Sequence, residues 1–249
     1  MVYDEAMGCV RCPLHETRTT VVFGAGNADA ELMFIGEAPG ANEDKQGLPF
    51  VGQAGKLLDK LLAEIGMERR DVFVLNVLKC RPPGNRDPHP AEIESCQDYL
   101  WRQVELIEPT VICTLGNFST KLLRRDGTGI SRLHGVEEVR IVGGRAVRLY
   151  PLFHPAAALY TPRMLETLRT DFRRLPEVLA LGPPPQPRVG AEPALADGRG
   201  LDAAPALPDV GGASAELAQP DLLGPIPELE PEQQSAPIER KPAAQLGLF

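Results

Sequence analysis

Four of the five cysteines have a spacing suited to holding a metal centre. Cys9 and Cys12 form a C-x2-C pair, and Cys80 and Cys96 follow as a C-x15-C pair after a long gap. Two thiolates in a C-x2-C pair can bind one metal centre together, and two more complete either a zinc site or an iron–sulfur cluster. The spacing leaves that choice open. The alternative is a set of unconnected buried thiols, which is our interpretation of Cys113 inside an apolar stretch.

A second group of residues could recognise a flat heterocycle. The small residues of 36–40 (Gly-Glu-Ala-Pro-Gly) would let the backbone approach a ligand closely. Phe50 lies among Pro and Gly residues, as an aromatic ring held on a loop for stacking would. Asn76 offers the donors and acceptor of a pyrimidine edge, and His154 follows another apolar stretch. Each residue alone could be structural, but together they suit recognition of a single extruded base.

Basic residues surround the segment that follows Asn76. Lys79, Arg81 and Arg86 could contact phosphates there, and the alternative is that they form a solvated face.

Apolar runs and helical spacing predict the scaffold that must bring these loops together. The predicted strands cover 31–36, 71–78 and 110–115, with a hairpin of 136–141 and 146–152. The predicted helices cover 53–65, 91–107, 117–124 (with Asn117 as its cap) and 163–180, broken near Pro176. This alternation predicts an α/β fold, a three-layer α/β/α sandwich with a mostly parallel sheet. Ligands bind beyond the carboxyl ends of such strands, where the loops named above fall.

Composition divides the 249 residues near position 181. From there to the end the chain has 13 of its 25 prolines, 4 basic and 10 acidic residues, and one aromatic, Phe249. Such a segment cannot bury enough apolar surface to offset chain entropy, so we expect a domain over 1–181 and a disordered linker over 182–244. The net charge of −8 for the whole chain is not typical of a nucleic-acid binder. The part before residue 181 is near neutral, however, and can carry a local basic face.

The chain shows no segment that would insert into a membrane. It has no run of 18 apolar residues, which excludes a transmembrane helix, and its acidic start argues against a secretory signal. We therefore expect a cytoplasmic protein, in which cysteines point to metal or catalysis before disulfides.

Several motifs, in order along about residues 8–180, resemble those of family 4 uracil-DNA glycosylases. They are the 36–40 loop, Gly47-Leu48-Pro49-Phe50-Val51-Gly52, the segment Asn76–Arg86 and His154-Pro155-Ala156-Ala157, together with the four cysteines. The resemblance implies a uracil-DNA glycosylase-like fold and removal of uracil from DNA, in single or double strands. It also implies a 4Fe–4S cluster rather than zinc, held by Cys9, Cys12, Cys80 and Cys96.

The resemblance also implies a role for each pocket residue. The backbone of Gly36, Glu37 and Ala38 would face the pyrimidine, Phe50 would stack on it, and Asn76 would bind its O4/N3 edge. His154 would donate to O2, where negative charge grows as the N-glycosidic bond breaks. Hydrolysis through an oxocarbenium-like sugar would leave an abasic site, and no lyase lysine is implied.

The resemblance leaves the acidic residue of the reaction open. Glu37 or Glu43 would orient water or stabilise the sugar cation.

Two departures from the family's pattern bear on the DNA contact. Ala158 stands at one place where the family has a wedging Leu, so Leu159, or else Tyr160, is expected to enter the vacated base stack. A related branch that forms a covalent adduct uses a His in an Arg-rich insertion. This chain has only His89, which we interpret as a helix-flanking residue.

The last five residues resemble the Gln-Leu-x-Leu-Phe peptide that docks on bacterial sliding clamps. Gln245 would be the polar anchor, and Leu246, Leu248 and Phe249 would bind an apolar groove; the alternative is a chance apolar terminus. We therefore expect uracil-containing DNA and the clamp as partners, no membrane, and a nucleoid-associated monomer.

The main interpretation is thus a monofunctional uracil-DNA glycosylase. The alternative is a non-catalytic, clamp-recruited DNA-binding module with a structural iron–sulfur cluster. The presence of Phe50, Asn76 and His154 favours the enzyme. An electron-transfer protein would need a more compact run of cysteines.

Overall fold

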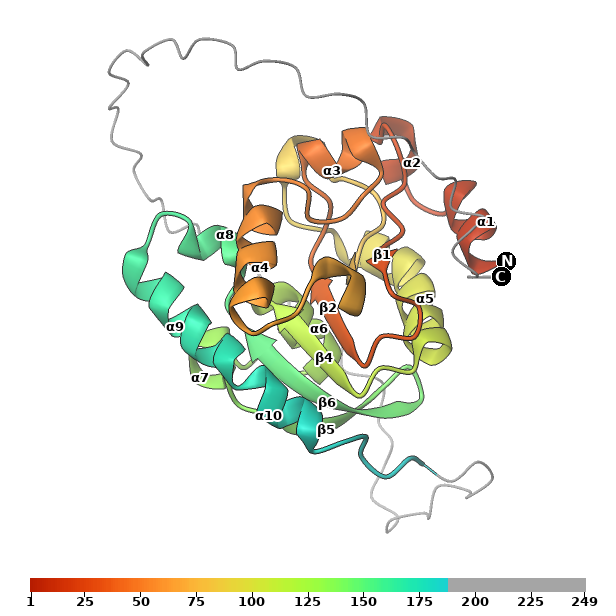
Figure 1. Cartoon of the computed structure of the whole chain (residues 1–249). Helices are drawn as coiled ribbons and strands as arrows, with labels where there is room; N and C mark the ends of the chain where they lie inside the picture. Colours follow the sequence, from red (N-terminus) through yellow and green to blue (C-terminus); the bar gives the residue numbers. More distant parts are fainter. Residues whose placement is uncertain (188–249) are drawn as a thin grey trace, which may run out of the picture. The chain divides into compact units, whose positions relative to one another are not determined.

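A six-stranded sheet in the order β1-β3-β2-β4-β6-β5 lies at the centre of the fold (Figure 1). The computed structural model describes residues 1–187. The four inner strands are parallel, and the two edge strands, β1 and β5, pair antiparallel. The strands are β1 (Ala25–Gly26), β2 (Leu32–Gly36), β3 (Phe73–Asn76), β4 (Val111–Leu115), β5 (Glu138–Val142) and β6 (Arg145–Leu152).

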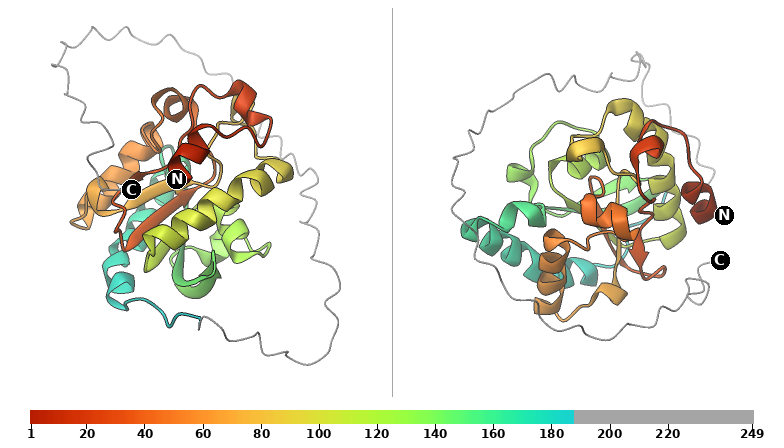
Figure 2. Two further views of the ribbon diagram at one scale, coloured as in Figure 1. Left: turned by 90° about the vertical axis from the view of Figure 1, so that its right-hand side faces the viewer. Right: turned by 90° about the horizontal axis from the view of Figure 1, so that it is seen from above.

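Helices cover both faces of this sheet, as the turned views of Figure 2 show. Side chains alternate along β2: Met33 and Ile35 pack into one core cluster with α5, and Leu32 and Phe34 pack into a second with α4 and α9. The helices are α1 (Val2–Met7), α2 (Leu14–Thr17), α3 (Ala41–Gln46), α4 (Gln53–Glu64), α5 (Pro90–Ile107), α6 (Asn117–Arg124), α7 (Ile130–Leu133), α8 (Pro155–Ala158), α9 (Pro162–Arg173) and α10 (Leu175–Ala180). The three-layer α/β/α prediction is confirmed.

The predicted long elements are present, with two differences of detail. The break in the last predicted helix separates α9 from α10 at Arg174. The prediction that Asn117 caps α6 is wrong: Gly116 is the N-cap, and Asn117 Oδ1 accepts a hydrogen bond from the Ile130 backbone N–H at 2.8 Å. Its side chain therefore joins α6 to the start of α7.

The described chain continues past the expected domain end at residue 181. The Gln186 amide pairs with the backbone N–H and C=O of Ala146 at 3.1 and 2.9 Å, and Arg148 Nε donates to the Gly182 carbonyl at 2.7 Å. The first residues of the expected linker thus lie against β6. The rest of that linker, and the expected clamp peptide, lie outside the described residues.

None of the helices within residues 1–187 combines the length and the apolar character that a membrane crossing requires.

Candidate active site

The ends of β2 and β3 bring two of the predicted pocket residues side by side. Gly36 and Asn76 are register partners at the carboxyl ends of these parallel strands. Just beyond, the Val77 N–H donates to the Gly36 carbonyl and the Leu78 N–H to the Glu37 carbonyl, each at 3.0 Å. These bonds hold the two loops together, so residues 40 positions apart in the chain share one small site.

The Asn76 side-chain amide makes no hydrogen bond within the described chain, although the residue is only 2% exposed. Its amide atoms are not among the fully enclosed atoms that lack a partner there. The amide is therefore open to a ligand with complementary donors and acceptors. This supports the predicted base-reading role of Asn76.

Phe50 presents its ring to the same site from a constrained loop. Its ring lies 2.7 Å from where a Cβ on Gly36 would be, and its backbone has a positive φ of 53°. Arg69 Nη2 donates to the Phe50 carbonyl at 2.6 Å. The backbone there also lies so close to Gly55 that a side chain at position 55 would overlap it. The ring is 6% exposed, so Phe50 is both a core residue and a wall of the site.

Glu43 holds the part of this loop that follows Phe50. Its Oε1 accepts hydrogen bonds from the backbone N–H groups of Val51 at 3.0 Å and Gly52 at 2.9 Å. Gly52 is the N-cap of α4, so the carboxylate also satisfies the otherwise unpaired start of that helix. The contacts of Glu43 are those of a residue that positions the Phe50 loop.

His154 lies where β6 ends and α8 begins. Its Nδ1 accepts a hydrogen bond from the Ala156 N–H at 3.1 Å, and its ring stacks on that of Phe50 with centroids 5.8 Å apart. Burial lowers the pKa of His154 to about 4, so the imidazole is neutral at physiological pH. With Nδ1 accepting, the proton is assigned to Nε2, which is then a neutral hydrogen-bond donor.

Glu37 is the carboxylate that remains free near these groups. It is half-buried and makes no side-chain hydrogen bond within residues 1–187. Burial raises its pKa, and the negative charge of Asp87 raises it further. Ala38, the third residue of this predicted backbone cradle, is also half-buried and packs against the core cluster of α5.

The predicted DNA contact of Lys79 is wrong. Lys79 is 2% exposed, and its ammonium donates to the Asn76 carbonyl at 2.8 Å. A side chain enclosed in this way cannot contact a phosphate.

The other predicted DNA contacts lie nearer the surface. Arg86 pairs with both carboxylate oxygens of Glu92, at 2.9 and 2.6 Å, and half-buried Arg81 bonds to Asn85. Leu159 is half-buried, whereas the neighbouring Tyr160 is 88% exposed.

The four predicted metal ligands line one cavity. It lies between the N-terminal segment, the residues after β3 and α5, and its lining includes Cys9, Cys12, Cys80 and Cys96. Two donors point at sulfur: Arg18 Nη1 lies 3.3 Å from Cys80 Sγ, and the Lys79 backbone N–H lies 3.3 Å from Cys96 Sγ. Cys113, as expected, is fully buried in the core.

The donor set at this cavity is four thiols. In the described part of the chain no three His, Cys, Asp or Glu side chains form a group that could hold one metal ion. Four cysteine thiolates are the ligands that both zinc sites and 4Fe–4S clusters use.

The electrostatics of the cavity depend on what the thiols bind. Burial raises the pKa values of Cys12 and Cys80, and raises that of Cys96 to about 11, so the free thiols are uncharged. Arg18 and Lys79 oppose this shift by favouring thiolates. A bound metal would favour thiolates far more strongly.

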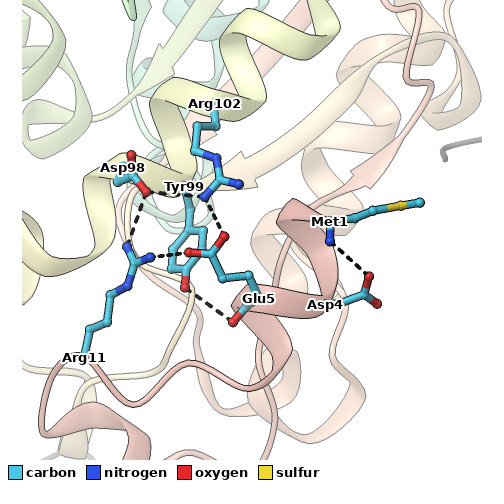
Figure 3. A network of polar contacts seen from close by, with 7 residues as sticks. All are labelled: Met1, Asp4, Glu5, Arg11, Asp98, Tyr99 and Arg102. Carbon is cyan, nitrogen blue, oxygen red and sulfur yellow. Dashed lines mark hydrogen bonds and ion pairs between the residues drawn. The ribbon is translucent and has the colours of Figure 1, made fainter.

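A network of charges fastens the segment with the C-x2-C pair to α5 (Figure 3). Glu5 pairs with Arg11 and with Arg102, and Arg11 also pairs with Asp98 at 3.3 Å. The Arg11 guanidinium lies 4.7 Å from the centre of the Tyr99 ring, and the Tyr99 hydroxyl donates to the Glu5 carbonyl at 3.4 Å. The cavity is thereby closed by contacts between residues some 90 positions apart.

Two residues near these sites were not predicted from the sequence. Arg18 and Asp87 act on Cys80 and Glu37 through space, and neither stands in a recognisable pattern. The only signal was the placement of a charged residue near a motif, which is too common to single them out.

Residues 23–177 match the uracil DNA glycosylase superfamily. The chain is 50% identical over 182 residues to the type-4 uracil-DNA glycosylase of Archaeoglobus fulgidus, covering 71% of this chain and 91% of that protein. It is 46% identical over 188 residues to the type-4 enzyme of Saccharolobus solfataricus, covering 74% and 87%. It is 45% identical over 161 residues to that of Thermotoga maritima, covering 64% and 82%.

Proposed function

The chain belongs to the uracil DNA glycosylase superfamily and is a monofunctional uracil-DNA glycosylase, and we propose that its active site is the one built on Gly36, Asn76 and His154. The reaction hydrolyses the N-glycosidic bond of deoxyuridine in DNA, giving free uracil and an abasic site for base excision repair. The observation that carries the site is that the Asn76 amide, at the end of β3, and the neutral His154 imidazole, just beyond β6, both lie beside the Phe50 ring.

Asn76 provides the discrimination between uracil and cytosine. Its Oδ1 would accept from uracil N3–H while its Nδ2 donates to O4. Cytosine presents an acceptor at N3 and a donor at N4, so both contacts would become repulsive. The Phe50 ring forms the wall on which the flipped base stacks.

His154 lowers the barrier to bond cleavage. As the bond between C1′ and N1 breaks, negative charge gathers on the uracil ring, and the Nε2–H of His154 would donate to O2 where part of that charge resides. A neutral donor fixed by the Ala156 N–H needs no reorganisation during the reaction. Uracil then leaves as an anion, water adds to C1′ of the oxocarbenium-like sugar, and the proton that this water releases balances the charge of the uracil anion.

Glu37 is the carboxylate we assign to the sugar side of the reaction. An ionised carboxylate near C1′ would stabilise the oxocarbenium-like sugar or orient the attacking water. Glu37 is free to do so, whereas Glu43 is engaged with the backbone of Val51 and Gly52. We infer that Glu43 acts indirectly, by holding the Phe50 loop in place.

We infer that a 4Fe–4S cluster is held by Cys9, Cys12, Cys80 and Cys96. The inference is supported by four thiols around one cavity and by the N–H donors that point at two of them. When bound, the cluster would crosslink the N-terminal segment, the residues after β3 and α5. That segment follows directly on Asn76, the last residue of β3, so the crosslink would stiffen the base pocket.

Three further expectations remain proposals. We propose that the enzyme acts as a monomer, that it works at the nucleoid, and that residues 245–249 dock on the sliding clamp. Deleting 245–249 should abolish clamp binding in a pull-down with purified clamp while leaving uracil release from a short oligonucleotide unchanged. Unchanged clamp binding would contradict the docking proposal.

The site is tested with anaerobically purified protein and a labelled oligonucleotide that contains one deoxyuridine. Wild type should give strand breaks only after alkali, because the product is an abasic site. Asn76→Ala and His154→Ala should each abolish most of that breakage, while Lys121→Met on the exposed side of α6 should leave it unchanged. Full activity of both pocket variants would place the chemistry elsewhere. Breakage without alkali would contradict the monofunctional assignment.

A further inference from the structure

Lys79 bridges the cysteine cavity and the base pocket. Its ammonium donates to the backbone carbonyl of Asn76 at 2.8 Å, and its backbone N–H donates to Cys96 Sγ at 3.3 Å. Its side chain also lines the cavity that contains the four cysteines. One residue thus contacts both a residue that reads the base and a proposed cluster ligand.

The charge of Lys79 has no carboxylate partner in the described part of the chain. None of the ion pairs found within residues 1–187 includes it, although it is 2% exposed. A buried ammonium is costly unless an anion compensates it. Within the described chain, what holds the ammonium is its hydrogen bond to the Asn76 carbonyl.

We propose that Lys79 is a positioning residue that couples the ligated cysteines to base reading by Asn76. The hydrogen bond from its backbone N–H to Cys96 Sγ ties Lys79 to a proposed cluster ligand, and its ammonium fixes the Asn76 carbonyl. Because the carbonyl and the amide side chain belong to one residue at the end of β3, fixing the first orients the second. The proposal rests on the function proposed above and assigns Lys79 a part in specificity for uracil.

A purely structural role for Lys79 makes a different prediction. If the side chain only filled space, its loss would loosen the whole enzyme and weaken every contact with DNA. If it only retained the cluster, its loss would lower the iron content but would not change the rate of uracil release by the molecules that keep the cluster. If Lys79 instead positions Asn76, its loss should slow uracil release by cluster-loaded enzyme and leave the affinity for DNA without a base at the site unchanged.

The test compares Lys79→Met, Lys79→Arg and the control Lys121→Met, all as full-length protein purified anaerobically. Lys79→Met matches the length of the side chain without its charge or donor, and Lys79→Arg keeps both. Three quantities are measured: iron and sulfide per chain, the affinity for a duplex with a stable abasic-site analogue, and the single-turnover rate of uracil release per cluster-loaded molecule. The abasic analogue carries no base, so its binding does not depend on Asn76.

For Lys79→Met we expect uracil release about tenfold slower per loaded molecule, as loss of a charged hydrogen bond would give. Its affinity for the abasic duplex should stay within about twofold of wild type, and Lys79→Arg should restore most of the rate. Unchanged uracil release per loaded molecule, or an equal loss of abasic-duplex affinity, would overturn the proposal. Wild type that releases no uracil would instead contradict the proposed function itself.

Discussion

A Cβ atom placed on Gly36 would lie 2.3 Å from Oδ1 of Asn76. The Asn76 amide can take this position only because residue 36 has no side chain. The backbone of Gly36 does not require glycine, since its φ is not in the left-handed region. Glycine is required because the Asn76 amide and the Phe50 ring fill the place that a Cβ would take.

Gly36→Ala should inactivate the enzyme and also lower its thermal midpoint, because the methyl group overpacks buried side chains. The added methyl would displace the Asn76 amide and the Phe50 ring, and misplacement by about 1 Å can cost on the order of a hundredfold in rate. Single-turnover uracil release and the thermal midpoint measure the two effects. Gly127→Ala is the matched control, because no atom lies within 4 Å of its Cβ position. A fully active Gly36→Ala would show that the base is read elsewhere.

His154 should stay neutral across the working range of the enzyme. Burial lowers the pKa of His154 to about 4, so its ring nitrogens should not titrate between roughly pH 5.5 and 8. Nitrogen-15 NMR of histidine-labelled protein reports both the pKa and the tautomer, and we expect protonated Nε2 with free Nδ1. His154→Ala should lower kcat by about a hundredfold or more, as loss of an oxyanion donor does. Titration of His154 near its ordinary pKa would contradict this assignment.

Asp87→Asn should move the acid limb of the pH profile to lower pH. Burial, and then the charge of Asp87, raise the pKa of Glu37. The role proposed for Glu37 requires it to be ionised. Activity is therefore lost as pH falls through that raised pKa, and removing the Asp87 charge lowers the pKa toward its ordinary value. The measurement is kcat/KM against pH.

Glu94→Gln, on the exposed side of α5, controls for a general change in charge. An acid limb that stays in place in Asp87→Asn would mean that Glu37 does not set it.

Glu43→Gln and Glu43→Ala should behave differently. If Glu43 acts by accepting hydrogen bonds from Val51 and Gly52, the amide oxygen of Gln can replace the carboxylate and activity should stay within about threefold. Ala removes both bonds, so the Phe50 loop should loosen and uracil release should slow by about tenfold or more. Equal losses in the two variants would show that the negative charge itself takes part in the reaction.

The long elements of the fold could be predicted because their patterns are local. Apolar runs predicted β2, β3 and β4, and helical spacing predicted α4 and α5. Helices of four to six residues, such as α2, α7 and α8, are too short to show a period, and they form because their surroundings fix them.

Within the site, the placement of the proposed pocket residues near strand ends was predictable, but the partners of their neighbours were not. Asn76 and His154 stand at the ends of predicted strands. The burial of Lys79 depends on α5 and on the N-terminal segment packing over it, which no pattern around position 79 reveals. The same holds for Glu43, whose bonds to residues 51 and 52 depend on how the intervening loop folds back.

The charge network between Arg11 and Asp98 has a consequence for how the protein is made. Cys9 and Cys12 are synthesised 84 residues or more before Cys96, the last of the four cysteines. At ribosomal rates of about 5–20 residues per second, the first pair waits roughly 4–17 s before α5 can close over it. During that interval the two thiols are open to oxygen and to other metal ions. The amount of correctly assembled protein should therefore depend on the oxygen tension and the speed of translation in the producing cell.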